Sequence, residues 1–113
     1  MFNKKYECIM TMEKEKLQNI LKNHELWLES KGEEGRRADF RWANLSAVNL
    51  EKANLEGADI CGANLERANL RGANLLEAYL EGANFSAVNL EKANLSNAFY
   101  NNKTVWPAGF NKI

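Results

Sequence analysis

The sequence predicts a four-sided solenoid that follows an amphipathic α-helix and is closed by a short C-terminal segment. Three observations lead to this prediction. Residues 38–102 repeat every five residues, in thirteen units without an insertion. A ten-residue segment, 46–55, recurs identically at 86–95. The apolar residues that precede the repeat fall at helical spacing.

The five-residue period fits neither ordinary element, because a helix repeats every 3.6 residues and a strand every two. The simplest structure turns a corner once per unit and buries the first and third positions. The first position is Ala in eleven units and Val in two, and the third is Leu or another large apolar residue. Small and large side chains then alternate in a narrow interior, as dense packing requires.

The number of sides follows from the duplicated segment. Its offset of forty residues equals two coils of twenty, whereas a coil of fifteen would put the copies on different faces. The duplication therefore favours four units per coil.

The repeat closely resembles the pentapeptide-repeat family, whose consensus is Ala-(Asp/Asn)-Leu-x-x. The second position is Asn or Asp in every unit except those of Tyr79 and Phe99. The resemblance implies an all-β solenoid, a right-handed quadrilateral β-helix of about three coils, with twenty residues per coil. It also implies an N-terminal capping α-helix.

Three segments follow: 1–37 before the repeat, 38–102 within it, and 103–113 after it. Residues 1–11 fit either a short strand or a frayed end. A helix is expected over about 12–30, with Thr11 as N-cap and Gly32 as the C-terminal cap glycine. Its apolar stripe consists of Leu17, Ile20, Leu21, His24, Trp27 and Leu28. The helix is expected to cover the first coil, and a partner-binding stripe is the alternative.

With four units per coil, residues twenty apart stack above one another. Both departures at the second position and the one Trp of the repeat then fall on the first face. This face is the candidate interaction face, because aromatic residues and Arg are enriched at protein interfaces. Its candidate residues are Trp42, Tyr79, Phe99, Arg41, Cys61 and Glu81. In the alternative interpretation the termini cover it, with Trp42 under the helix and Phe99 under the tail.

The third face is expected to carry a ladder of alternating charges, Glu51, Arg71 and Glu91, exposed to solvent. The Asn residues of the second position are expected to support the corners, since Asn bonds its own backbone in turns. In the tail, Val105, Trp106 and Phe110 are expected to close the last coil, with Pro107 and Gly109 in turns. The alternative is that this end contacts a second copy, as the resemblance suggests.

The composition argues against several classes of function for this protein. The formal charge is zero overall and about −3 within the repeat, and no basic cluster suggests direct nucleic-acid binding. Neither a transmembrane run nor a signal peptide is visible. Cys8 and Cys61 lack ligand spacing, which favours free thiols in the cytoplasm. No catalytic, cofactor or metal motif occurs, and His24 is expected to be a packing residue. A non-enzymatic protein is therefore expected, with no cofactor and no membrane partner.

Two functions remain. The first is a rigid protein-interaction or scaffold module with an unidentified protein partner. The second follows from the resemblance: a mimic of duplex DNA that inhibits or protects a DNA-handling enzyme such as DNA gyrase. The expected rod is only about 16 Å long at roughly 4.8 Å per coil, and Arg and Lys interrupt its acidic charge. A homodimer through one end would double both length and charge.

Overall fold

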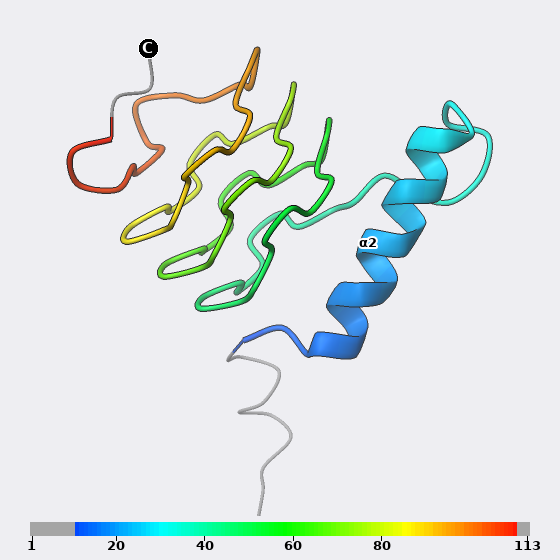
Figure 1. Cartoon of the computed structure of the whole chain (residues 1–113), viewed down its shortest axis with the longest axis horizontal. Coiled ribbons are helices and arrows are strands. Elements are labelled where there is room, and N and C mark those ends of the chain that lie inside the picture. Colours follow the sequence, from blue (N-terminus) through cyan, green and yellow to red (C-terminus); the bar gives the residue numbers. More distant parts are fainter. Residues whose placement is uncertain (1–10, 111–113) are drawn as a thin grey trace, which may run out of the picture.

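The computed structural model describes residues 11–110. The expectations for residues 1–10, including the one for Cys8, lie outside the described residues. The described part contains one helix, α2 (Lys14–Glu29), followed by successive passes of the chain that lie side by side (Figure 1). Within residues 11–110, no helix has the length and apolar character needed to cross a membrane.

The passes are joined by isolated parallel bridges between residues twenty apart. Three such columns begin at Asn44, Asn49 and Asn54, and a fourth runs from Asp39 through Asp59 and Tyr79 to Phe99. The spacing agrees with four five-residue units per coil. The expected all-β content takes the form of single-residue bridges within 11–110, because each unit turns a corner before a longer strand can form.

The interior contains the residues of the first and third positions, as expected. Large side chains such as Phe40, Leu65 and Phe85 are fully buried, and Ala residues such as Ala58 and Ala78 fill the space between them. Burial weakens toward the end of the repeat, where Tyr100 is 45% exposed. The core therefore runs along the axis of the passes and is least covered at its C-terminal end.

In every unit but the last, the corner is made by a residue with positive φ at the fifth position. Glycine adopts this left-handed conformation readily, but other residues do so at a cost. These non-glycine positions are Trp42, Ala47, Lys52, Arg67, Glu77, Ala87, Lys92 and Asn97. The second-position side chain supports the corner: Oδ1 of Asn69, for example, accepts a hydrogen bond from the backbone N–H of Arg71 at 3.0 Å. The expected role of the Asn residues is confirmed.

The bounds of α2 agree with the expected helix, but its caps differ. Glu13 is the N-cap and makes no side-chain capping bond, whereas Thr11 Oγ1 lies 3.4 Å from Ser46 Oγ. At the other end Lys31 and Gly32 both have positive φ, and Gly32 N–H donates to the Trp27 carbonyl at 2.8 Å. The expectation of a Thr11 N-cap is thus wrong. Gly32 does take part in the C-terminal cap, as expected, but it lies one position after the usual cap glycine, because Lys31 takes the left-handed position directly after the C-cap.

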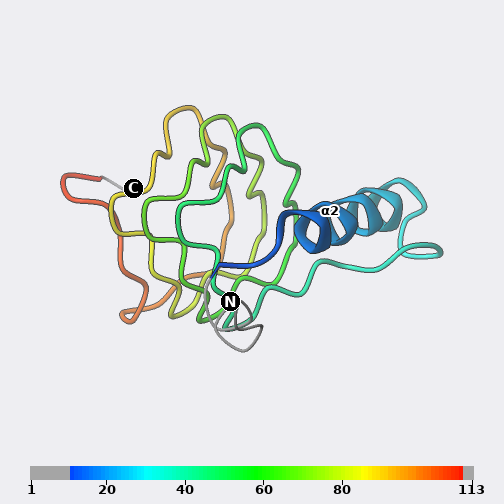
Figure 2. The ribbon, with the colours of Figure 1, turned by 90° about the horizontal axis from the view of Figure 1, so that it is seen from below.

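A buried histidine joins α2 to the first passes. His24 is completely buried. Its Nδ1 accepts a hydrogen bond from Ala38 N–H at 2.9 Å, and its Nε2 lies 2.8 Å from the Glu56 carbonyl oxygen. Because Nδ1 accepts, the proton must be on Nε2. Figure 2 shows α2 beside the first passes and extending past them on one side.

The C-terminal segment, from residue 103, adds one more bridge to the column that begins at Asn44, but with a spacing of twenty-one residues instead of twenty. Val105 bridges Asn84, twenty-one positions earlier. Thr104 Oγ1 donates to the Leu80 carbonyl at 3.0 Å and accepts from the backbone N–H of Asn101 at 3.1 Å. Trp106 stacks on Phe85 with centroids 5.3 Å apart. The side chain of Thr104 thus satisfies backbone groups at the point where the repeat ends.

Candidate interaction face

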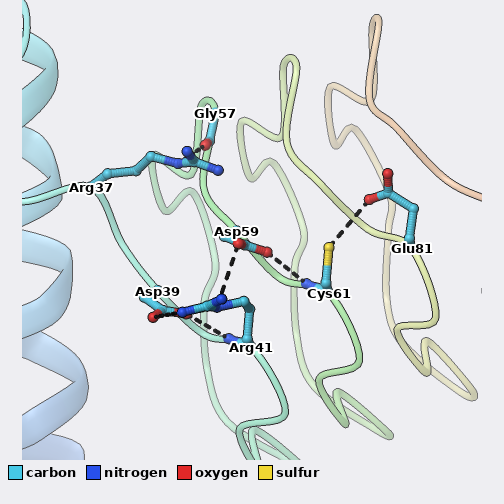
Figure 3. A network of polar contacts seen from close by, with 7 residues as sticks. All are labelled: Arg37, Asp39, Arg41, Gly57, Asp59, Cys61 and Glu81. Carbon is cyan, nitrogen blue, oxygen red and sulfur yellow. Dashed lines mark hydrogen bonds and ion pairs between the residues drawn. The ribbon is translucent and has the colours of Figure 1, made fainter.

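The first face consists of residues 38–42, 58–62, 78–82 and 98–102, and its polar part forms one connected network (Figure 3). Arg41 donates to Asp39 through Nε and Nη2, both at 2.9 Å. Its Nε also lies 3.7 Å from Asp59 Oδ2 in the next pass. These bonds from Arg41 hold the pKa of Asp39 at about 2, so Asp39 stays ionised at any physiological pH.

Cys61 lies in the same network and is a poor nucleophile. Its thiol donates to Glu81 Oε1 at 3.3 Å, and its backbone N–H donates to Asp59 Oδ1 at 3.2 Å. Burial, followed by the bonds to Asp59 and Glu81, raises the pKa of the Cys61 thiol to about 12. Since the thiolate is the reactive form, the Cys61 thiol is a weak nucleophile near neutral pH.

One edge of the face carries a stack of planar side chains. The rings of Tyr79 and Phe99 are parallel, with centroids 4.8 Å apart. The guanidinium of Arg37 lies over the Tyr79 ring, 4.7 Å from its centroid. Arg37 Nε also donates to the Gly57 carbonyl at 2.9 Å, which fixes the guanidinium in place. Phe99 remains 45% exposed at the end of this stack.

Trp42 occupies the opposite edge and is 81% exposed. It adopts a left-handed backbone conformation with φ 61°, and its ring lies directly against Gly62. A Cβ at Gly62 would sit 2.2 Å from Trp42 Cε3. The alternative interpretation that α2 covers Trp42 is therefore wrong. Phe99, similarly, is packed on Tyr79 rather than enclosed by the tail.

The structure divides the six candidates into four groups. Tyr79 and Phe99 form the stack, Cys61 and Glu81 form a hydrogen-bonded pair, and Arg41 binds Asp39 and Asp59. Trp42 stands apart at its own corner. The sequence analysis did not single out Arg37, because it lies one residue before the first unit of the repeat. If the five-residue register is extended backwards, Arg37 occupies the fifth position of residues 33–37.

A shallow hollow of about 280 Å³ lies where α2 meets the edge of the stack. Trp27 contributes from α2, and Tyr79 and Phe99 contribute from the first face. Glu56 and Glu77 also line this hollow, which we call the corner hollow. Its existence could not be read from the sequence, since it depends on where α2 lies against the repeat.

The third face is a solvated ladder, as expected. Arg71 lies between two glutamates, 3.8 Å from Glu51 and 3.5 Å from Glu91. All three side chains are more than one third exposed, so the pairs contribute little stability. Within residues 11–110, no group of three His, Cys, Asp or Glu residues could hold a metal ion.

Comparisons with known proteins agree with the repeat. A family model described as pentapeptide repeats matches in 8 copies, over residues 38–75 and 63–99. The chain is similar to the crystal structure of the pentapeptide repeat protein Rfr23 from the cyanobacterium Cyanothece 51142, with 35% identity, a TM-score of 0.48, and 66% of this chain and 68% of that chain covered. It is also similar to alr5209, a pentapeptide repeat protein from Nostoc Pcc 7120, with 28% identity, a TM-score of 0.31, and 80% and 86% covered. No curated protein matches the chain.

Proposed function

Because the chain belongs to the pentapeptide-repeat family, we propose that it is a rigid, non-enzymatic interaction module whose first face binds a protein partner. The fold we infer for it is a right-handed, four-sided β-helix of about three coils, with α2 as its N-terminal cap. The bridges between residues twenty apart support the coil. The bonds of His24 to Ala38 and Glu56 support the cap.

The exposure of Trp42 is the observation that favours binding at the first face. Because the Trp42 side chain is 81% exposed, its burial contributes little to the stability of the fold. Its left-handed backbone conformation costs about 1–2 kcal/mol. The other described fifth positions with a left-handed backbone carry glycine or a small, polar or charged side chain. Trp42 alone places a large aromatic ring in solvent at this position, which favours contact with a partner. Trp and Arg are also the side chains that most often dominate binding energy at interfaces.

The fixed positions of the side chains on the first face support the same proposal. The Arg41 network and the Tyr79–Phe99 stack are held by bonds within the first face, so their side chains lose little further freedom on binding. A preorganised surface of this kind suits a scaffold. We place the module in the cytoplasm, where a free Cys61 thiol stays reduced, and an end-to-end homodimer would leave the first face accessible.

The test is affinity capture from host lysate with matched variants. Trp42 and Lys52 both occupy left-handed fifth positions, on the first and third faces respectively. We expect Trp42→Ala to lose the captured partner, while Lys52→Ala retains it, with both variants melting close to the parent protein. Equal capture by the two variants would contradict binding at the first face.

Mimicry of duplex DNA is the weaker candidate. Arg41 and Arg71 lie between carboxylates on the first and third faces, whereas duplex DNA presents an unbroken run of negative charge. A gyrase supercoiling assay separates the candidates. We expect no change in supercoiling at micromolar protein, and inhibition at that concentration would favour mimicry.

A further inference from the structure

We propose that the corner hollow binds an arginine side chain from a basic segment of the partner protein. This inference rests on the proposed function and names the chemistry that the edge of the first face recognises.

The rings of the corner hollow are arranged to accept a planar cation. Arg37 shows that the stack takes a guanidinium on a ring face, since its Cζ lies 4.7 Å from the Tyr79 centroid. Tyr79 is covered on its other face by Phe99, at 4.8 Å. Phe99 is the last ring of the stack and remains 45% exposed. It therefore offers a further aromatic surface to a cation from outside.

The charge of the corner hollow also favours a cation. Glu56 and Glu77 line it, and neither carboxylate forms an ion pair with another residue of the described range 11–110. Among the residues of 11–110 that line the corner hollow, Arg37 is the one with a cationic side chain. Two carboxylates against one guanidinium leave a net negative charge at the corner hollow. On the third face, by contrast, both glutamates are already paired with Arg71.

Arginine fits this combination better than lysine. Its guanidinium is flat and weakly hydrated, so it can stack on a ring and donate to a carboxylate at the same time. A lysine ammonium is a strongly hydrated point charge and gains less from a ring face. The occupant that fits is thus a segment with an exposed arginine, not a neutral apolar peptide.

The probe is a fluorescein-labelled hexa-arginine peptide, titrated with the full chain at low salt and followed by anisotropy. Hexa-citrulline, which has the same shape without charge, and hexa-lysine are the peptide controls. We expect saturable binding of hexa-arginine, weaker binding of hexa-lysine and none of hexa-citrulline. Lack of saturable binding, or equal binding of the arginine and lysine peptides, would overturn the inference.

Matched variants locate the binding. We expect Glu77→Gln and Phe99→Leu each to weaken hexa-arginine binding by about two- to fivefold, the size of one exposed cation–π or ion-pair contact. Glu91→Gln removes the same charge on the third face and is expected to leave binding unchanged. If Glu91→Gln weakens binding as much as Glu77→Gln, the peptide is responding only to overall charge and the inference fails.

Chemical-shift mapping of the unmodified chain with hexa-arginine locates the binding site without any substitution. Shifts are expected at Trp27, Glu77 and Phe99, and shifts confined to the third face would contradict the site. The two proposals can fail separately. Capture of a partner through Trp42 together with no binding of hexa-arginine would overturn this inference and leave the interaction module standing.

Discussion

His24 connects α2 to the repeat by hydrogen bonds to two backbone groups, the N–H of Ala38 and the carbonyl of Glu56. Its Nδ1 accepts from Ala38 N–H and its Nε2–H donates to the Glu56 carbonyl. Burial lowers the pKa of His24, Arg37 lowers it further, and the bond to the Glu56 carbonyl opposes the change. A proton on Nδ1 would set two donors against each other, so the neutral ring is the folded form.

We expect the stability of the protein to fall as the pH drops below about 6.5, the usual pKa of an unfolded histidine. The unfolded chain then binds a proton that the folded chain excludes, so the contribution of His24 is present above this pH and is lost below it. Thermal melts between pH 5 and pH 8 measure the effect. Since His24 is the only histidine, a His24→Gln variant should lack this dependence; if it keeps the parent profile, another group is responsible.

Gly57 and Gly62 are a natural pair for testing the position of Trp42. Both have positive φ, 68° and 69°, but a Cβ at Gly57 meets nothing within 4 Å, whereas at Gly62 it meets the Trp42 ring at 2.2 Å. Each change to Ala is expected to cost about 1–2 kcal/mol for the left-handed backbone. Only Gly62→Ala should also displace the indole and shift its fluorescence. Identical spectra for the two variants would contradict the contact.

Among the elements, the tail shows how the end of the repeat is closed. Thr104 is buried, and its hydroxyl donates to the Leu80 carbonyl and accepts from Asn101 N–H. Thr104→Val keeps the shape and removes these bonds, so we expect a loss of about 1–3 kcal/mol in the free energy of unfolding. Urea denaturation measures it. The matched change Thr11→Val, at an exposed site with longer contacts of 3.4–3.5 Å, should be nearly neutral.

The helix illustrates which features of an element can be read from sequence. Its extent followed from the spacing of Leu17, Ile20, His24 and Trp27, because burial of one helix face imposes that period. Its caps did not follow. Thr11 lies near Ser46 and Glu13 takes the N-cap position, and this choice depends on how the helix meets the repeat rather than on local preference.

At the scale of the whole molecule, the five-residue period predicted which side chains are buried, which residues stack and which face gathers the aromatic residues. The interior is narrow and its small and large positions recur every five residues, so units in the middle of the repeat share a similar environment. The contacts across elements could not be predicted. The guanidinium of Arg37 over Tyr79 and the exposure of Trp42 both depend on the path that the chain takes between α2 and the first unit.

Site-specific photo-crosslinking in the host cell tests the central claim, that the first face is the binding surface, most directly. A photoreactive phenylalanine analogue replaces Tyr79 or Trp42 on the first face, and Lys52 or Lys92 on the third face in the matched controls. We expect a discrete adduct with a partner protein from positions 79 and 42 and none from 52 and 92. Adducts from 52 and 92 alone, or equal adducts from all four positions, would contradict the account.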